Sequence, residues 1–350
     1  MIKKVIVAPL NWGLGHASRC VPIIKSLIEH KFTPVLASDG QALLFLLKEF
    51  PELEYIELPS YNIGYAKNLK WSLVLQTPKI LNAVKNERQI IAKYVRNNSL
   101  NGIISDNRFG VRSKQIPSVY ITHQINILSG VSTSLTSKIH HKIINKFDEC
   151  WIPDTKEQPN FSGKLSKISD NGISAKFIGV LSRFKKESLD SENDVLIILS
   201  GPEPNRSQLE EKLRSEFKNF HGSLALVQGK VEEQQTRSQI NNITIYNYLL
   251  SDELQNQINK SELIVCRSGY SSIMDLAILS KKAFFIPTMN QPEQEYLAKY
   301  LEENNMAPYA TQNEFKPELL KRIKNYKGLT TKAIELDSSL FNLFKSKRKS

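Results

Sequence analysis

The sequence predicts an α/β protein built from two doubly wound domains. Short runs of β-branched and aliphatic residues alternate with longer amphipathic stretches along most of the 350 residues. Buried strands that alternate with helices in this way form parallel sheets covered on both faces. The pattern occurs twice, because a polar stretch, Gln158–Lys176, separates two series of strands. Such sheets bind ligands beyond the carboxyl ends of their strands, and two domains that face each other form a cleft there.

The first series starts at the N-terminus with a short apolar run. Polar residues follow this run at once, so we expect a strand and not a signal sequence. In the next segment, Ala17–His30, apolar residues recur at helical spacing on one face, from Val21 to Ile28. The predicted strands of this series are Lys4–Pro9, Thr33–Ser38, Glu54–Leu58, Gly102–Ser105, Ser118–Thr122 and Glu149–Pro153.

The second series follows the polar stretch and has the same alternating pattern. We therefore expect an N-terminal domain at residues 1–175, a C-terminal domain at 176–329, and a last helical stretch with a basic tail at 330–350. The predicted strands of the second series are Asp194–Leu199, Ser223–Gln228, Thr244–Tyr246, Glu262–Cys266 and Ala283–Pro287.

Composition limits the classes of partner and compartment. The formal net charge of +12 suits an anionic partner such as a phosphorylated substrate or an anionic membrane surface. The sequence carries no RNA-binding, zinc-finger or helix-turn-helix signature, so we expect no nucleic-acid partner. The three cysteines follow no disulfide or metal-binding spacing, which favours a cytoplasmic protein.

Residues 67–79 mix apolar and basic side chains in a way that suits the surface of an anionic bilayer. The alternative is a helix that packs its apolar face inward. We therefore treat peripheral contact with the inner face of the cell membrane as a hypothesis. The residues concerned are Lys67, Lys70, Trp71, Leu73, Val74, Leu75 and Lys79.

The segment Cys266–Ser272 is the most informative part of the chain. It follows the apolar run Leu263–Val265, so it predicts a buried strand that turns tightly and opens a helix rich in serine. The first turn of a helix presents unpaired N–H groups and the positive end of the helix dipole, which attract phosphate. On spacing alone, an ordinary turn with serine capping fits equally well.

The loop Asn11–Arg19, after the first strand, contains two glycines and a histidine. Gly13 and Gly15 let the backbone pass close to a ligand, and His16 falls at the start of the following helix. No third glycine follows at the spacing of a dinucleotide-binding fingerprint. His16 is a candidate base, although capping or packing is the more common role of such a histidine.

Polar side chains also follow two later strands of the first series. Asp106 and Arg108 follow one strand, and His123 follows the next. A carboxylate and an imidazole at strand ends form a candidate acid/base site. The alternative is a helix-capping Asp106 paired with Arg108. No Asp-x-Asp pair follows a strand, so we expect no metal cofactor and assign charge neutralisation to helix dipoles and arginines.

Other loops of the second series also contain candidate ligand-binding groups. Gly201 lies in a glycine turn before a helix and can approach a phosphate, and Arg183 lies near the junction of the two series. Asp275 lies seven residues after Ser268 on the same helix face, where a carboxylate can hold the vicinal hydroxyls of a ribose, although a surface aspartate is the more common case. Amide and carboxylate groups in Pro287–Glu295 suit a polyhydroxylated partner.

In these motifs the chain resembles the two-domain GT-B glycosyltransferases, and most closely the MurG-like enzymes of glycosyltransferase family 28. A strand, an Arg-Ser-Gly turn, a serine-rich helix start, an acidic residue seven positions on and a strand that ends in Pro before a Glu-Gln helix follow one another in the family's order. The N-terminal Gly-Leu-Gly-His loop is similar to the family's glycine-rich loop. The resemblance implies two Rossmann-like domains that face each other across a cleft, and a final helix that returns to the first domain.

The resemblance also implies roles for individual residues. The start of the helix at 268–272 would hold the diphosphate, Asp275 would replace the family's ribose-binding glutamate, and Tyr248 would lie near the base, expected to be uracil. Gln294 would face the donor sugar. The implied donor-binding residues are Gly15, Arg183, Gly201, Tyr248, Leu249, Arg267, Ser268, Gly269, Tyr270, Ser271, Ser272, Asp275, Gln294 and Glu295.

Two segments depart from the family pattern. The N-terminal loop continues as Ala-Ser-Arg, and the segment Asp106–Gly110 has no counterpart among MurG-like enzymes. Both segments belong to the expected acceptor half, so the acceptor is not inferred from the resemblance.

The leading hypothesis is an inverting, metal-independent transfer of a sugar from a nucleotide-diphosphate donor, expected to be a UDP-sugar, to a hydroxyl acceptor. The candidate bases are His16, Asp106 and, third, His123. The alternatives are a UDP-sugar 2-epimerase-like enzyme, which uses the same architecture, and a non-catalytic nucleotide-sugar-binding protein.

Overall fold

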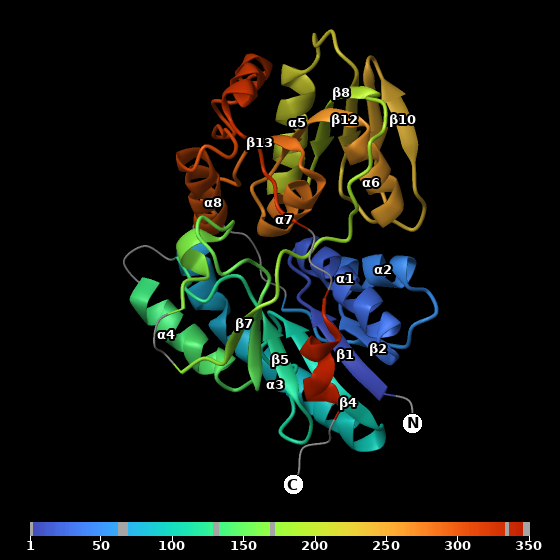
Figure 1. The fold of residues 1–350 in the computed structure, drawn as a ribbon, viewed down its shortest axis with the longest axis vertical. Coiled ribbons are helices and arrows are strands. Elements are labelled where there is room, and N and C mark those ends of the chain that lie inside the picture. The colour runs from blue at the N-terminus through green and yellow to red at the C-terminus, as the bar shows by residue number, and fades with distance from the viewer. Residues whose placement is uncertain (1–2, 62–68, 129–132, 169–171, 333–335, 346–350) are drawn as a thin grey trace. The chain divides into compact units, whose positions relative to one another are not determined.

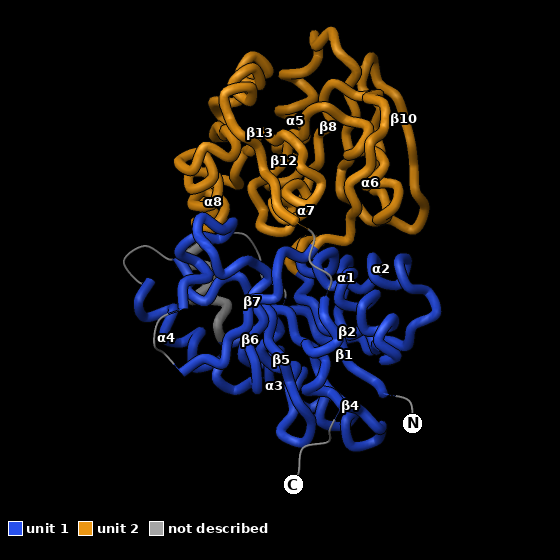
Figure 2. Tube along the Cα trace, viewed as in Figure 1, with its two compact units in different colours: residues 1–11, 16–181, 334–350 blue, residues 12–15, 182–333 orange. Residues whose placement is uncertain are grey.

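The computed structural model describes residues 3–61, 69–128, 133–168, 172–332 and 336–345, with the side chains of 69–77 excepted. The chain forms two compact units (Figure 2). Unit 1 comprises residues 1–11, 16–181 and 334–350, and unit 2 comprises residues 12–15 and 182–333. Each unit has its own sheet, so the predicted pair of doubly wound α/β domains is confirmed.

Unit 1 contains a seven-stranded parallel sheet in the order β3-β2-β1-β4-β5-β6-β7, with helices packed beside it (Figure 1). The central strands β1 and β4 are buried over most of their length on both faces, as expected for strands in the middle of a parallel sheet. The strands are β1 (Lys3–Pro9), β2 (Phe32–Ser38), β3 (Tyr55–Glu57), β4 (Leu100–Asp106), β5 (Ser118–Ile121), β6 (Glu149–Ile152) and β7 (Ala175–Phe177). The α-helices are α1 (Gly15–Glu29), α2 (Gly40–Glu49), α3 (Leu69–Asn97) and α4 (Thr133–Ile144).

Strand β7 is a difference from the sequence-based prediction. The prediction ended the first domain at residue 175, within a polar linker, whereas β7 pairs with β6 and unit 1 continues to Leu181. The strand is short, and none of its side chains is fully buried, so it carries no apolar run. Backbone pairing at the sheet edge, and not a hydrophobic pattern, therefore extends the unit.

Unit 2 contains a six-stranded sheet in the order β10-β11-β9-β8-β12-β13. Strand β10, which the sequence analysis missed, pairs antiparallel with β11 at the edge, and the other pairings are parallel. The strands are β8 (Asn193–Ile198), β9 (Leu224–Val227), β10 (Arg237–Ile240), β11 (Ile243–Tyr246), β12 (Ser261–Cys266) and β13 (Lys282–Phe285). The α-helices are α5 (Asn205–Glu216), α6 (Ser251–Asn259), α7 (Tyr270–Leu279) and α8 (Pro292–Glu303).

The last described segment of the chain packs in the core of unit 1. Residues Ser338–Phe344 form a short 3₁₀ helix, where the sequence predicted a longer helical stretch from residue 330. Phe341 and Phe344 are fully buried, and their rings lie 6.2 and 6.1 Å from that of Trp151 on β6. Gly102 on β4 has no side chain because the Phe344 ring fills the place of a Cβ atom.

The membrane hypothesis drew on residues 67–79. Lys67 and the side chains of Lys70, Trp71, Leu73, Val74 and Leu75 lie outside the described residues, and Lys79 is exposed on α3. Among the described residues, no helix is both long enough and apolar enough to cross a bilayer.

Gly102→Ala is expected to destabilise the chain by about 1–3 kcal/mol, because a methyl group would overlap the Phe344 ring. Phe344→Ala is expected to cost about 3–5 kcal/mol by leaving a cavity. The double variant should cost clearly less than the sum, since the alanine at 102 then occupies part of that cavity. Urea unfolding measures all three, and strict additivity would contradict this packing.

Candidate functional site

The carboxyl ends of β1 and β4 form the topological switch point of unit 1. The chain leaves β1 toward β2 on one side, whereas β4 leads to β5 on the other. Ligand crevices of open α/β sheets form at such points. The pairing register sets Pro9 beside Asp106 at this edge, and Asp106 is also paired with Ile121 of β5, two residues before His123.

Four polar side chains meet at this switch point. His16 Nδ1 lies 2.8 Å from Asp106 Oδ1. Arg19 donates from Nε to Asp106 Oδ2 and from Nη2 to Asp106 Oδ1, and its Nη1 lies 3.1 Å from His123 Nδ1. The structure thus brings the three sequence-predicted residues His16, Asp106 and His123 into one cluster around an arginine that the sequence analysis did not select.

Arg19 was missed although a signal for it was present. It lies three residues after His16 in the same predicted helix, and residues at that spacing are neighbours on a helix face. The spacing therefore already indicated that the Arg19 side chain lies beside His16 and belongs among the candidate site residues.

Burial sets the electrostatics of this cluster. The side chains of Asp106 and Arg19 are 0% and 2% exposed, whereas that of His16 is 16% exposed. Burial alone would raise the pKa of Asp106, but the charges and hydrogen bonds of Arg19 and His16 hold that pKa below its ordinary value. Asp106 is therefore a carboxylate at neutral pH.

The alternative reading of Asp106 as a partner of Arg108 is wrong. Arg108 is fully buried and donates from Nε to Glu87 at 2.7 Å and from Nη1 to Asp39 at 2.6 Å. Asn11, in the loop after β1, donates to the other oxygen of Asp39 at 3.0 Å. Arg108 thus belongs to a separate ionic network that braces the glycine-rich loop.

Unit 2 has its own switch point, between β8 and β12. The chain leaves β8 toward β9 on one side, while β12 leads to β13 on the other. The loop after β8 holds Gly201, whose backbone is left-handed with φ of 102° and has open space beside it. The loop after β12 leads into α7, with Gly269 at its N-cap. Both loops that were predicted to bind phosphate therefore lie at the topological switch point of this unit.

The amino end of α7 combines buried and accessible groups. Ser268 is fully buried and donates to the backbone oxygen of Gln294 at 2.8 Å, so its hydroxyl ties α7 to α8. Ser271 and Ser272 are half-buried in the first turn. Apart from the two chain neighbours of Gly269, no atom of the described residues lies within 4 Å of the place where it would carry a Cβ, which leaves the backbone open to a close approach.

Four further residues predicted to bind the donor are buried. Arg267 is 1% exposed and donates to three backbone oxygens and to Gln312, so its guanidinium braces the loops around β12 and β13. Tyr270, Tyr248 and Leu249 also lie in the interior of unit 2. Gly15 starts α1 and groups with the short segment 12–15 in unit 2.

Asp275 lies on α7 and accepts a hydrogen bond from Ser182 Oγ at 2.6 Å. Burial raises the pKa of Asp275 to about 6, although the charge of Arg183 and the Ser182 hydrogen bond oppose this shift. Ser182 is a neighbour that the sequence analysis did not identify. The carboxyl group therefore lies within a polar pair and is not an ordinary surface aspartate.

Gln294 and Glu295 lie in the first turn of α8. The side-chain oxygen of Gln294 accepts a hydrogen bond from the Thr288 N–H at 2.9 Å, and Glu295 accepts one from Asn290 N–H at 2.9 Å. These bonds hold the loop between β13 and α8 against the start of α8. The backbone oxygen of Gln294 is also the acceptor of the Ser268 hydrogen bond.

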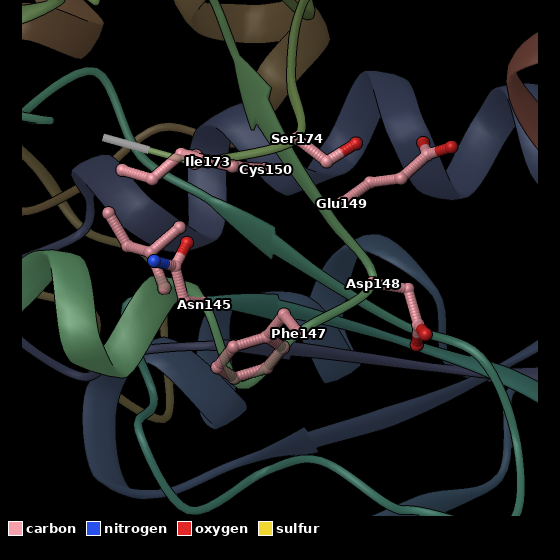
Figure 3. A pocket seen from close by; sticks show the side chains of 9 residues that line it. Asn145, Phe147, Asp148, Glu149, Cys150, Ile173 and Ser174 are labelled. Atoms are coloured by element: carbon pink, nitrogen blue, oxygen red, sulfur yellow. The ribbon is translucent and has the colours of Figure 1, made fainter. Parts of the chain in front are cut away.

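A separate pocket of about 230 Å³ lies in unit 1, between the end of α4 and the starts of β6 and β7 (Figure 3). Asp148, Glu149 and Ser174 line it. It lies at the amino ends of these strands, whereas ligands of such sheets bind at the carboxyl ends. No group of three or more His, Cys, Asp or Glu residues suited to a metal ion occurs in the described part of the chain.

Comparisons with known proteins agree with this architecture. Residues 200–331 match the glycosyltransferase family 28 C-terminal domain. The UDP-N-acetylglucosamine--N-acetylmuramyl-(pentapeptide) pyrophosphoryl-undecaprenol N-acetylglucosamine transferase of Buchnera aphidicola is 26% identical over 290 residues, covering 78% of this chain and 75% of the relative. The transferase of the same name from Histophilus somni is 26% identical over 262 residues, covering 71% and 70%.

Solved structures share the fold. MurG of Acinetobacter baumannii matches with a TM-score of 0.53 and 15% identity, and the glycotransferase of kitacinnamycin with 0.63 and 14%; both matches cover 92% of this chain and 89% of the other. Together, the comparisons show that the chain has the GT-B fold, that residues 200–331 are similar to the family 28 C-terminal domain, and that the curated relatives resemble it over most of its length. It is an enzyme that transfers a sugar from a nucleotide sugar.

The raised pKa of Asp275 predicts a pH-dependent stability. The folded chain holds this proton more tightly than the unfolded chain, so the stability contribution of Asp275 is greatest below about pH 4 and falls as pH rises through 6. Asp275→Asn removes this titration. As pH rises from 4 to 7, the free energy of unfolding of the variant should increase relative to that of the wild type by on the order of 1–3 kcal/mol. Urea midpoints across this range measure the gain. The exposed Asp190→Asn is the matched control, and equal pH profiles for all three chains would contradict the prediction.

Proposed function

We propose that this enzyme transfers the sugar of a nucleoside diphosphate sugar, with inversion, to a hydroxyl group of an acceptor. The observation that carries the proposal is the pairing of His16 with the buried carboxylate of Asp106 at the switch point of unit 1. A histidine held in this way can act as a general base next to a ligand crevice.

His16 is the proposed base, and Asp106 orients it. Asp106 is fully buried, and Arg19 donates to both of its oxygens, so the more exposed His16 is better placed than Asp106 to reach an acceptor hydroxyl. If Nδ1 of His16 donates to Asp106, Nε2 keeps a lone pair that can take the proton of the acceptor hydroxyl. The hydroxyl oxygen then bonds to the anomeric carbon as the bond to the diphosphate breaks. Attack opposite the leaving group inverts that carbon.

The amino end of α7 is the proposed seat of the diphosphate. Its first-turn N–H groups and helix dipole favour negative charge, and that charge grows as the nucleoside diphosphate leaves. Gly201 and Gly269 flank the same switch point and leave space for a close approach. Asp275, later on α7, is proposed to hold the ribose hydroxyls, and Gln294 the donor sugar.

The relatives are named as UDP-N-acetylglucosamine-dependent transferases, so we propose a UDP-sugar as the donor and UDP-N-acetylglucosamine as the first one to test. The acceptor of those relatives is not extended to this chain, because Asp106–Gly110 lies in the acceptor half and departs from the family pattern. The proposed transfer requires no metal ion, which an assay in excess chelator tests. Neither the epimerase nor the non-catalytic alternative is favoured by the relatives.

Peripheral contact with an anionic membrane at the cytoplasmic face is a further part of the proposal. On α4, Leu135 and Ile139 are 64% and 53% exposed, and they lie one helical turn apart. Lys138 and Lys142 are exposed on the same helix. Exposed apolar side chains beside lysines favour the interface of an anionic bilayer.

His16→Ala is expected to lower kcat by about 100- to 1000-fold, because the acceptor hydroxyl loses its base. Donor affinity, measured by calorimetry with UDP, should stay near the wild-type value, since the proposed nucleotide site lies in unit 2. The transfer assay uses labelled UDP-N-acetylglucosamine and detects any labelled product. His221→Ala, an exposed histidine, is the control.

Near wild-type turnover in both His16→Ala and Asp106→Ala would overturn the assignment of the base. An isomerised UDP-sugar formed without any acceptor would instead favour the epimerase. Binding of UDP-sugars without turnover of any donor would favour a non-catalytic binding protein.

The double variant Leu135→Ser, Ile139→Ser is expected to sediment several-fold less with vesicles that contain anionic lipid. Each serine removes apolar surface that the wild-type side chain would bury in the bilayer interface. The difference in sedimentation between anionic and zwitterionic vesicles measures the electrostatic contribution to binding. The matched control is Ile240→Ser, which alters a 48% exposed isoleucine of unit 2. Equal sedimentation of the double variant and the wild type would contradict a membrane role for α4.

A further inference from the structure

His16 Nδ1 has two neighbours that compete for it. Asp106 Oδ1 and Arg19 Nη2 both lie 2.8 Å from this nitrogen. A ring nitrogen either donates one hydrogen bond or accepts one, and an arginine can only donate. If Nδ1 carries a proton, it bonds to Asp106; if it does not, it accepts from Arg19. Only one of these two short contacts can be a hydrogen bond at a time.

The choice between the two decides whether His16 can act as a base. With Nδ1 bonded to Asp106, the neutral ring leaves its lone pair on Nε2. With Nδ1 accepting from Arg19, the neutral ring carries its proton on Nε2 and cannot take another proton there. An ionised Asp106 favours the first arrangement, because a hydrogen bond to a carboxylate is stronger than one to a neutral nitrogen.

Asp106 in turn depends on Arg19 for its charge. A fully buried carboxylate is costly unless a cation and hydrogen bonds compensate it. Arg19 supplies the cation and two donors from a side chain that is itself 2% exposed. His16 adds a positive charge only when its ring is doubly protonated. Two further groups beside the carboxylate are uncharged: Cys20 lies 3.7 Å from Oδ2, and the Asn107 amide donates to Oδ1 at 3.2 Å. The buried hydroxyl of Tyr120 on β5 is the remaining titratable neighbour.

His123 fixes the guanidinium from the opposite side. Because arginine only donates, the 3.1 Å contact makes His123 Nδ1 an acceptor and puts the proton of the neutral ring on Nε2. Arg19 is thus held at Nε, Nη1 and Nη2, and its planar fork cannot turn away from Asp106.

We propose that Arg19 is a positioning residue that keeps Asp106 ionised and thereby holds His16 with its proton on Nδ1, and that His123 orients Arg19. This inference rests on the proposed role of His16 as the base. It assigns His123 a role as an orienting group of the site and not as a base.

The experiment reads the protonation of His16 directly, by ¹⁵N–¹H NMR of the full chain labelled in its histidines. The His16 signal is assigned by its loss in His16→Gln. We expect the neutral His16 ring of the wild type to carry its proton on Nδ1. We expect Arg19→Met to show either a doubly protonated ring to higher pH or the proton on Nε2, because the Asp106 charge then acts on His16 alone or is itself lost.

Kinetics supply the second readout. The acid limb of kcat in Arg19→Met should move by about one pH unit or more, upward if Asp106 stays ionised and downward if Asp106 takes up a proton, while the KM for UDP-N-acetylglucosamine changes little. Arg19→Lys keeps the charge but not the fork, and His123→Ala keeps the guanidinium but removes its partner at Nη1, so both should move the limb by less in the same direction. If Arg19→Met does not fold, the pH profiles of these two milder variants test the proposed role of Arg19.

An unchanged His16 tautomer and pH profile in the folded Arg19 and His123 variants would overturn the inference. If instead the NMR changes appear while His16→Gln keeps wild-type turnover, the role of Arg19 stands and the proposed base fails. The NMR readout needs no substrate, so the two failures are distinguishable.

Discussion

The burial of one charge constrains the whole candidate site of unit 1. Asp106 ends a central strand with no exposure to solvent, and a carboxylate can stay ionised there only if a cation is brought to it. Arg19 is that cation, and it comes from the first helix. The ion pair therefore fixes α1 against the end of β4, and with it the position of His16. His16 is therefore positioned by the same ion pair that compensates the buried charge of Asp106.

A second buried network uses the next charged residue of the same loop. Asn107 has a left-handed backbone with φ of 58°, a conformation that asparagine tolerates better than most residues, and it separates Asp106 from Arg108. Arg108 then joins Glu87 on α3 and Asp39 after β2, and Asp39 holds Asn11 of the glycine-rich loop. Asp106 and Arg108, two residues apart, thus belong to two different networks of unit 1. This accounts physically for a segment that departs from the family pattern.

The two units place their chemistry by the same topological rule. In each sheet, the chain leaves two neighbouring strands in opposite directions, β1 and β4 in unit 1 and β8 and β12 in unit 2. Open α/β sheets bind ligands at the carboxyl edge of such a strand pair. Unit 1 sets a histidine and a carboxylate there, and unit 2 sets two glycine turns and a helix start. The division agrees with a transferase in which one domain activates an acceptor and the other binds the nucleotide.

The sequence alone determined the two α/β domains, every central strand and the helix after Cys266, because buried parallel strands require continuous apolar runs that periodicity reveals. It also selected His16, Asp106 and His123, since ligand sites follow strand ends. It missed β7 and β10, which edge pairing creates without an apolar pattern, and it offered Arg108 as the partner of Asp106. Only the tertiary structure decided that Arg19 holds Asp106 and that Arg267 is turned into the core. Which charges pair depends on the directions of side chains across neighbouring strands and helices, and local spacing such as that of His16 and Arg19 indicates neighbours on one helix but not their partner on another element.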